Sequence, residues 1–88
     1  MATVITTDEA LQQIEELPVP IGVRVRRILV RLGQWPEVSG AKPLRGALAG
    51  RYRMRTGDYR VQFHASDRTT SAVLTVEKVG HRDGFYDD

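Results

Sequence analysis

The chain has 88 residues, of which 41% are hydrophobic and 27% charged, and its formal net charge is +2. This length accommodates a single core, so we expect one domain over residues 1–88. Because there is no cysteine, disulfides and thiolate metal sites are excluded. The N-terminal segment lacks the basic and apolar regions of a signal peptide, and no apolar run reaches the ~18 residues of a membrane helix, which predicts a cytoplasmic protein without membrane contact.

A short β-strand is expected first, over residues 2–6, followed by a helix. Thr6 and Glu9 have the spacing of a capping box, which predicts that the helix starts near Thr7. Apolar residues then recur at helical spacing until Pro18 closes the segment. The apolar positions of this helix are Ala10, Leu11, Ile14 and Leu17.

A second helix is expected to begin near Pro20, which fits a first helical turn, and to end at Gly33. Its apolar stripe consists of Ile21, Val25, Ile28, Leu29 and Leu32, and its opposite face has Arg24, Arg27 and Arg31. The short Pro-containing link between the two helices predicts an αα-hairpin.

The apolar period changes to two after a loop over residues 34–46. Three strands are expected, over residues 48–56, 59–65 and 71–79, with Gly57-Asp58 as the first turn and Gly80 as the end of the last strand. The order β-α-α-β-β-β predicts an α+β fold in which an antiparallel three-strand meander packs its helices on one face.

The segment RYRMRTGDYR places an arginine at every second position of one predicted strand. Side chains alternate across a strand, so Arg51, Arg53 and Arg55 share a face. On the return strand Arg60, Gln62 and His64 form the polar set, which lies on the same side if both apolar sets face the helices. Two interpretations follow from this pattern: a solvated polar face, or a cation array that binds an anionic partner.

The charge distribution favours the cation array. From Arg24 to Arg60 there are ten basic residues against only Glu37 and Asp58, and the other acids lie toward the two ends. Since few carboxylates are close in sequence, we expect that no internal counter-ion neutralises this face. Arginine, which outnumbers lysine by 11 to 2, offers a planar fork of donors that matches phosphate.

The runs KPLRGALAGRYRMRTGDYRVQF and VEKVGHRDGFY resemble the RelE/ParE superfamily of type II toxin–antitoxin toxins, on the RelE side. The resemblance covers nearly the whole chain, and it implies a RelE-like fold. It also implies an endoribonuclease that enters the ribosomal A site and cuts mRNA there, by attack of a 2′-hydroxyl on the adjacent phosphate, and so inhibits translation and arrests growth.

The resemblance also implies site residues. Arg53 and Arg55 match the two basic residues that hold the phosphate, and Arg60 matches a second phosphate contact. Arg82 matches an arginine near the leaving group. Tyr86 matches a C-terminal tyrosine that stacks on the substrate and is a candidate base.

Two departures from the family pattern affect these roles. Relatives often have lysine at Arg53 and Arg55, and a guanidinium, whose pKa lies far above neutral, is a poor proton donor. The spacing from Arg82 to Tyr86 is also shorter than in some relatives.

Other residues near the predicted site have less defined roles. Histidine titrates near neutrality, so His81 is a further catalytic candidate, beside the alternative that Tyr86 is the base. His64 is assigned to RNA binding, with a plain strand position and an acid–base role as its alternatives. Arg45 and Arg51 match no catalytic position and are assigned to RNA backbone contact or solvation.

The partners that the resemblance implies are mRNA, the ribosome and a RelB-like antitoxin from the adjacent gene, in a toxin–antitoxin hetero-oligomer. No cofactor is expected, and the spacing of the histidines and acids predicts no metal site. The main alternative has the same fold: a ParE-like DNA gyrase inhibitor without nuclease activity.

Overall fold

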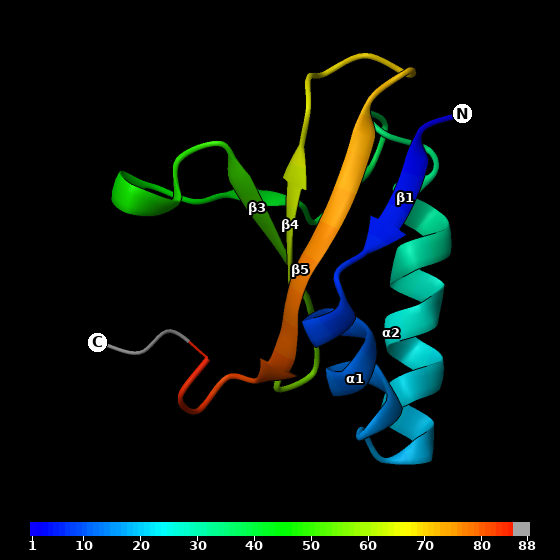
Figure 1. Ribbon diagram of the computed structural model, residues 1–88, viewed down its shortest axis with the longest axis vertical. Helices are drawn as coiled ribbons and strands as arrows, with labels where there is room; N and C mark the ends of the chain where they lie inside the picture. Colours follow the sequence, from blue (N-terminus) through cyan, green and yellow to red (C-terminus); the bar gives the residue numbers. More distant parts are fainter. Residues whose placement is uncertain (86–88) are drawn as a thin grey trace.

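The computed structural model describes residues 1–85, and it has one β-sheet with both helices on the same face (Figure 1). The elements in chain order are β1 (Thr3–Thr6), α1 (Asp8–Glu15), α2 (Val19–Leu32), β2 (Lys42–Pro43), the 3-10 turn η1 (Gly46–Leu48), β3 (Arg51–Thr56), β4 (Tyr59–Ala65) and β5 (Val73–His81). Within these residues no helix has both the length and the apolar character needed to cross a membrane.

The sheet has five strands in the order β1-β5-β4-β3-β2. The predicted meander is confirmed, because β3 pairs antiparallel with β4 and β4 pairs antiparallel with β5. Two short edge strands extend it: β1 lies parallel to β5, and β2 lies antiparallel to β3. Pro43 fits in β2 because an edge strand has a side that needs no hydrogen-bond donor.

The first helix begins one residue later than its sequence pattern indicates. Thr7, not Thr6, is the N-cap, and its hydroxyl oxygen accepts a hydrogen bond of 3.0 Å from the Ala10 amide. Thr6 is instead the last residue of β1, in register with Val76. The pairing with β5 therefore decides which threonine caps the helix. The predicted end of α2 is confirmed, since Gly33 is its C-cap.

Several strand boundaries also differ from the predictions, most of all the start of β3. The strand expected from Leu48 begins only at Arg51, because Gly46 and Gly50 adopt φ values of +64° and +90° around η1 and interrupt the extended backbone. The last strand, expected to end before Gly80, continues through it to His81. Gly80 pairs with Arg60 of β4, so the ladder persists across the glycine.

The core lies between the helices and the sheet. Three residues of the predicted α2 stripe, Val25, Ile28 and Leu32, are buried there against β4 and β5 residues such as Val61, Phe63, Leu74 and Val76. Of the apolar residues of α1, Ala10 and Ile14 are buried, whereas Leu11 is 47% exposed. Trp35, from the segment after α2, closes one end of the core and contacts Phe63 edge-on, with ring centroids 5.7 Å apart.

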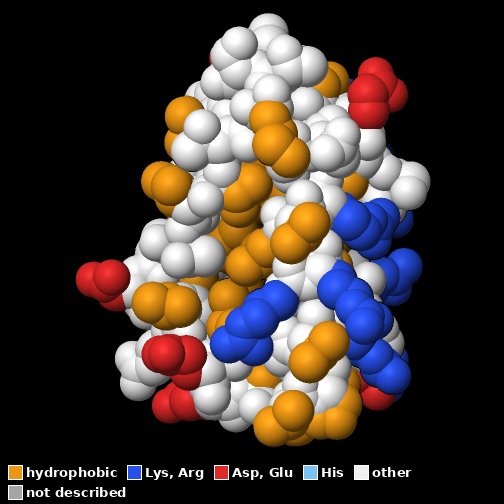
Figure 2. Space-filling view, turned by 90° about the vertical axis from the view of Figure 1, so that its right-hand side faces the viewer, with side chains coloured by type: hydrophobic (Ala, Val, Ile, Leu, Met, Phe, Trp, Pro, Cys, Tyr) orange, Lys and Arg blue, Asp and Glu red, His pale blue; other side chains and the backbone are white. Residues whose placement is uncertain are grey.

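The surface on the helix side combines exposed apolar and basic side chains (Figure 2). The exposed large apolar residues of the two helices are Leu11, Val19, Val23 and Val30. Lys and Arg side chains lie beside the apolar ones in this view (Figure 2). This surface is separate from the opposite face of the sheet, which has no helix over it (Figure 1).

Candidate anion-binding site

The face of the sheet away from the helices is rich in arginine. The β3–β4 register pairs Arg51 with His64, Arg53 with Gln62 and Arg55 with Arg60. The alternate residues of the same strands, among them Met54, Val61 and Phe63, are buried in the core. The six paired residues therefore share the open side, as the alternation predicts. We call this set, Arg51, Arg53, Arg55, Arg60, Gln62 and His64, the arginine face.

A tight turn holds β3 and β4 in this register. Thr56 pairs with Tyr59, so Gly57 and Asp58 form a two-residue hairpin loop. Gly57 has φ +59°, and no non-glycine residue among those described has a positive φ. A glycine at the first central position matches a type II′ turn, whose twist suits a hairpin. The turn thereby brings Arg60 opposite Arg55.

Arg53 and Arg60 have unsatisfied hydrogen-bonding capacity. Arg53 Nε and Arg60 Nη1 are both buried, and neither has a hydrogen-bond partner among residues 1–85. A buried donor without a partner costs about 1–3 kcal/mol. An anion bound between these side chains offers the missing acceptors. Arg55 beside them is exposed and forms no ion pair within the same residues.

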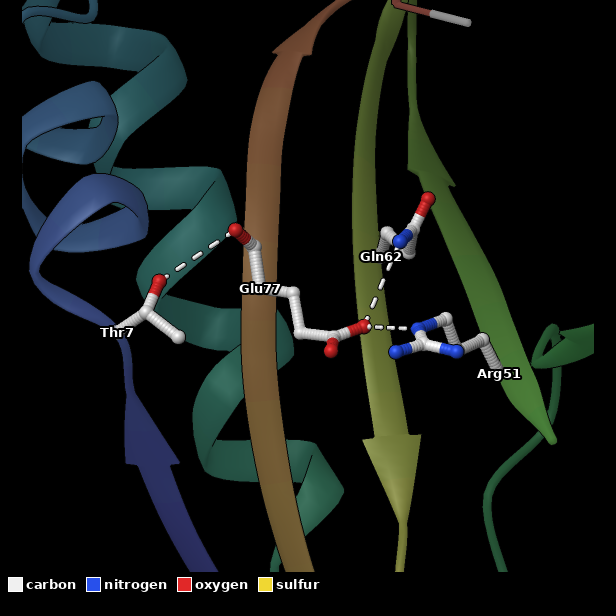
Figure 3. A network of polar contacts seen from close by, with 4 residues as sticks. All are labelled: Thr7, Arg51, Gln62 and Glu77. Atoms are coloured by element: carbon white, nitrogen blue, oxygen red, sulfur yellow. Dashed lines mark hydrogen bonds and ion pairs between the residues drawn. The ribbon is translucent and has the colours of Figure 1, made fainter. Parts of the chain in front are cut away.

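Arg51 has an internal counter-ion, which corrects the expectation from sequence. Arg51 Nε donates to Glu77 Oε1 at 2.7 Å, and Gln62 Nε2 donates to the same oxygen at 3.4 Å (Figure 3). Glu77 is 26 residues from Arg51 in sequence, and β5 brings it there. The expectation was wrong because it considered only carboxylates close in sequence.

A bulge in β5 accounts for the position of Glu77. Gln62 pairs with Lys78 and Phe63 pairs with Val76, so Glu77 is an extra residue without a partner on β4. Bulges of this kind redirect a side chain and locally interrupt the ladder. Lys78, whose register partner is Gln62, also belongs to the open side of the sheet. Neither Glu77 nor Lys78 was identified from the sequence.

Phe85 covers part of the open side near the end of β5. It is 2% exposed, and a Cβ built on Gly80 would lie 3.4 Å from its ring. The Lys78 ammonium donates to the Phe85 carbonyl oxygen and lies 4.7 Å from the ring centroid. Phe85 is thus buried against the open side of the sheet, whereas the main core lies on the helix side.

Arg82 lies beside the β3–β4 turn. Its backbone N–H donates to the Asp58 carbonyl at 2.7 Å, and its Nε is 3.8 Å from carboxylate oxygens of both Asp58 and Asp83. These exposed ion pairs are weak. The backbone hydrogen bond to Asp58, in the β3–β4 turn, places Arg82 at the end of the sheet where Arg55 and Arg60 lie.

His81 is not on the arginine face. It is the last residue of β5, not a residue after the strand as expected, and it pairs with Tyr59. Their rings meet edge-on at 5.3 Å. Tyr59 alternates with Arg60, so this pair belongs to the helix side of the sheet.

The contacts of the His81 ring involve Asp83. His81 Nδ1 accepts a hydrogen bond of 3.1 Å from the Asp83 amide, and the Asp83 carboxylate is 3.5 Å from the same nitrogen. An accepting Nδ1 cannot also donate to the carboxylate, so the two contacts belong to different protonation states.

The remaining predicted residues are distributed around the site. His64 is half-buried on the arginine face, opposite Arg51. Arg45 is exposed at the start of η1, next to Leu44, whose amide donates to the Arg51 carbonyl at 2.9 Å. Tyr86 lies outside the described residues. Within residues 1–85 no group of three or more His, Cys, Asp or Glu side chains could hold a metal ion.

Three solved structures of known proteins are similar to this chain in fold. The toxin–antitoxin complex RelBE2 from Mycobacterium tuberculosis has a chain 32% identical to this one, with a TM-score of 0.75 over 91% of this chain and 90% of that chain. The YoeB/ParE toxin from Agrobacterium tumefaciens is 18% identical, with a TM-score of 0.74 over 90% and 97%. The isolated RelE toxin of E. coli is 22% identical, with a TM-score of 0.71 over 90% and 82%.

The two more distant likenesses support the fold alone. No protein-family model matches the sequence, and no curated protein sequence matches it significantly. The identity to the Mycobacterium tuberculosis chain extends over nearly the full length of both proteins. The chain therefore belongs to the RelE/ParE superfamily of toxin–antitoxin toxins.

Proposed function

We propose that this toxin is a metal-free endoribonuclease that cuts mRNA in the ribosomal A site and thereby inhibits translation. The observation that supports the proposal most directly is that three residues of the arginine face, Arg53, Arg55 and Arg60, have no counter-ion among residues 1–85. Arg53 and Arg60 have buried N–H groups without acceptors, and Arg55 beside them has no ion pair among residues 1–85. An RNA phosphate provides both the charge and the acceptor oxygens that this arrangement lacks.

In the proposed reaction the 2′-hydroxyl of one nucleotide attacks its own 3′-phosphate. A base takes the hydroxyl proton, the new O2′–P bond forms, and the P–O5′ bond breaks as the leaving oxygen gains a proton. The products are a 2′,3′-cyclic phosphate and a 5′-hydroxyl. Negative charge accumulates on the phosphorane in the transition state, and donors fixed around it lower the barrier. Arg53, Arg55 and Arg60 are the donors we assign to this role.

The proton transfers need groups other than these arginines. Guanidinium groups do not titrate near neutral pH, so they stabilise charge without donating protons. We assign Arg82 to the leaving-group side, since it lies at the same end of the sheet as Arg60. Tyr86 remains the candidate base and stacking group. His81 is the second candidate, although its strand position directs it toward the helix side.

The proposal includes an antitoxin that binds and inhibits this toxin. Several related solved structures are toxin–antitoxin complexes, among them intact E. coli RelBE and RelB–RelE from Methanococcus jannaschii. On this chain the exposed apolar residues of the helix side offer a surface of the kind that a partner buries (Figure 2). We therefore expect a hetero-oligomer with a RelB-like protein from the adjacent gene.

Expression in growing cells, with and without the product of the neighbouring gene, tests the proposal. Mapping of the 5′ ends of cellular mRNA should show new cuts within codons only when the toxin is free. Arg60→Ala and Arg82→Ala should abolish the cuts while the protein stays folded. Arg27→Ala, an exposed arginine of α2, is the matched control and should leave them unchanged.

Two results would contradict the proposal. Growth arrest without new cuts, accompanied by gyrase-linked DNA breaks, would indicate the ParE-like activity instead. Cutting that persists in Arg60→Ala would show that the arginine face is not the site.

A further inference from the structure

We infer that Glu77 is a specificity-determining residue, which confines phosphate binding to the Arg53–Arg60 part of the arginine face by occupying Arg51. The inference deepens the proposed function and rests on it in taking the bound anion to be an RNA phosphate. It explains why the RNA backbone would bind at Arg53 and Arg60 and not at Arg51, which the proposed function leaves open.

The first argument is the chemistry of the Arg51 end. Glu77 Oε1 accepts hydrogen bonds from Arg51 Nε at 2.7 Å and Gln62 Nε2 at 3.4 Å, and the ion pair is half-buried, with side-chain exposures of 34% and 25% (Figure 3). A charge-assisted bond of this length is strong. Arg51 therefore has its charge and its Nε donor satisfied without RNA.

The second argument is the contrast along a single strand. Arg53 lies two residues further along β3, roughly 6.8 Å away at the usual strand rise. Within the described residues 1–85, its Nε is buried without a hydrogen-bond partner, as is Nη1 of Arg60. Arg51 and Arg53 are the same residue type on the same face, and among residues 1–85 they differ in whether a carboxylate contacts them.

The third argument is that Glu77 is held in place from both flanks of strand β5. It is the extra residue of the β5 bulge, and its backbone carbonyl accepts a hydrogen bond of 3.4 Å from the Thr7 hydroxyl at the start of α1 (Figure 3). Its carboxylate is thus fixed at one end of the arginine face. A phosphate that approached Arg51 would meet this negative charge, whereas a phosphate near Arg53 and Arg60 would meet unpaired donors.

A binding experiment that needs no ribosome and no cleavage tests the inference. The full chain is titrated with inorganic phosphate while the arginine Nε–Hε signals are followed by NMR. In the native protein Arg53 and Arg60 should respond and Arg51 should not. In Glu77→Gln, which keeps the size of the side chain but removes the charge, Arg51 should respond as well. Glu37→Gln, at an exposed loop carboxylate, makes the same change in net charge and should behave as the native protein.

The salt dependence of RNA binding is a second readout, and it would not change if Glu77 had a purely structural role. The probe is a 2′-O-methyl RNA oligonucleotide, which has no attacking hydroxyl. An added phosphate contact steepens the slope of log K against log [salt] by about 0.7 for a single strand. Glu77→Gln should show this steeper slope, and the double variant Glu77→Gln/Arg51→Gln should return to the native slope.

The outcomes separate the inference from the proposed function. Three results would each overturn the inference. Arg51 responds to phosphate in the native protein, or Arg53 and Arg60 do not respond. The third is that Glu77→Gln and Glu37→Gln have equal effects. If Glu77→Gln does not fold, Arg51→Gln serves instead: an unchanged slope supports the inference, and a slope reduced by about 0.7 overturns it. If the protein binds phosphate as expected but cuts no mRNA, the inference about Glu77 stands and the proposed nuclease activity is contradicted.

Discussion

Arg55 and Arg60 face each other directly across the β3–β4 ladder, and neither forms an ion pair among residues 1–85. Like charges in directly opposed positions destabilise a sheet. The fold thus retains an unfavourable pair at the site proposed to bind phosphate. Sites that bind or react often reduce stability in this way, because they are shaped for a partner that the free protein lacks.

Replacing Arg55 should therefore stabilise the free protein. We expect Arg55→Gln to raise the free energy of unfolding by about 0.5 kcal/mol at low salt, with a smaller gain at high salt because ions screen the repulsion. Urea unfolding at two salt concentrations measures this. Arg45→Gln, an exposed arginine without a cross-strand arginine, is the control and should change little. A loss of stability in Arg55→Gln would contradict the expectation.

Replacing Arg53 or Arg60 should weaken RNA binding through lost phosphate contacts. Each of Arg53→Gln and Arg60→Gln should make the salt dependence of single-stranded RNA binding shallower by about 0.7 in log–log slope. Arg27→Gln on α2 removes the same charge from another surface and should leave the slope unchanged. Equal slopes for all three variants would mean that the arginine face does not bind the RNA backbone. Fluorescence anisotropy over a series of salt concentrations gives these slopes.

Removing the Phe85 ring should lower the free energy of unfolding of the protein. The side chain is buried against Gly80 and Lys78, so Phe85→Ala loses apolar burial and the cation–π contact. We expect a loss of about 3 kcal/mol in the free energy of unfolding, as for other buried Phe→Ala changes. Leu11→Ala, at a position that is 47% exposed, should cost far less in the same urea titration. A cost for Phe85→Ala as small as that of the control would show that the ring contributes little to the fold.

The N-cap of α1 should depend on the hydroxyl of Thr7. Thr7→Ala removes the acceptor for the Ala10 amide and should cost about 1 kcal/mol of stability. Thr7→Ser keeps the hydroxyl and should retain most of the native stability. Thermal and urea unfolding of the two variants decide this. Equal losses for alanine and serine would assign the effect to the methyl group and not to the cap.

The pKa of Asp67 should rise when Thr69 loses its hydroxyl. The Thr69 hydroxyl, and after it the Thr69 amide, donate to Asp67 Oδ1 at 2.6 and 2.7 Å and hold the pKa of this carboxyl below its ordinary value. A lowered pKa in the folded protein favours folding above the ordinary pKa, and the benefit is lost as the pH falls through the folded value.

Thr69→Ala should therefore move the pKa of Asp67 toward its ordinary value and weaken the acid-side pH dependence of stability. NMR titration of the Asp67 carboxyl follows the change directly. Thr70→Ala, at the exposed neighbouring position, is the control and should leave the titration as it is in the native protein. An unchanged Asp67 titration in Thr69→Ala would show that the hydroxyl bond is not the main cause.

The sequence by itself determined the two helices, the three-strand meander and the shared face of the arginines. Helix and strand periods are local properties, so the α2 stripe of Val25, Ile28 and Leu32 and the alternation of Arg53 with Met54 are readable without coordinates. The turn at Gly57 is equally local, since it depends on a glycine φ. The opposition of Arg55 and Arg60 follows from these two facts.

Only the tertiary structure decided which of these arginines are neutralised. Glu77 reaches Arg51 because β5 pairs with β4 and bulges by one residue at that point, and no period in the sequence marks a bulge. The same pairing turned His81 to the helix side. Contacts between distant segments depend on strand register, and one inserted residue changes which side chains meet. The physical difference between Arg51 and Arg53 is therefore a property of the folded sheet.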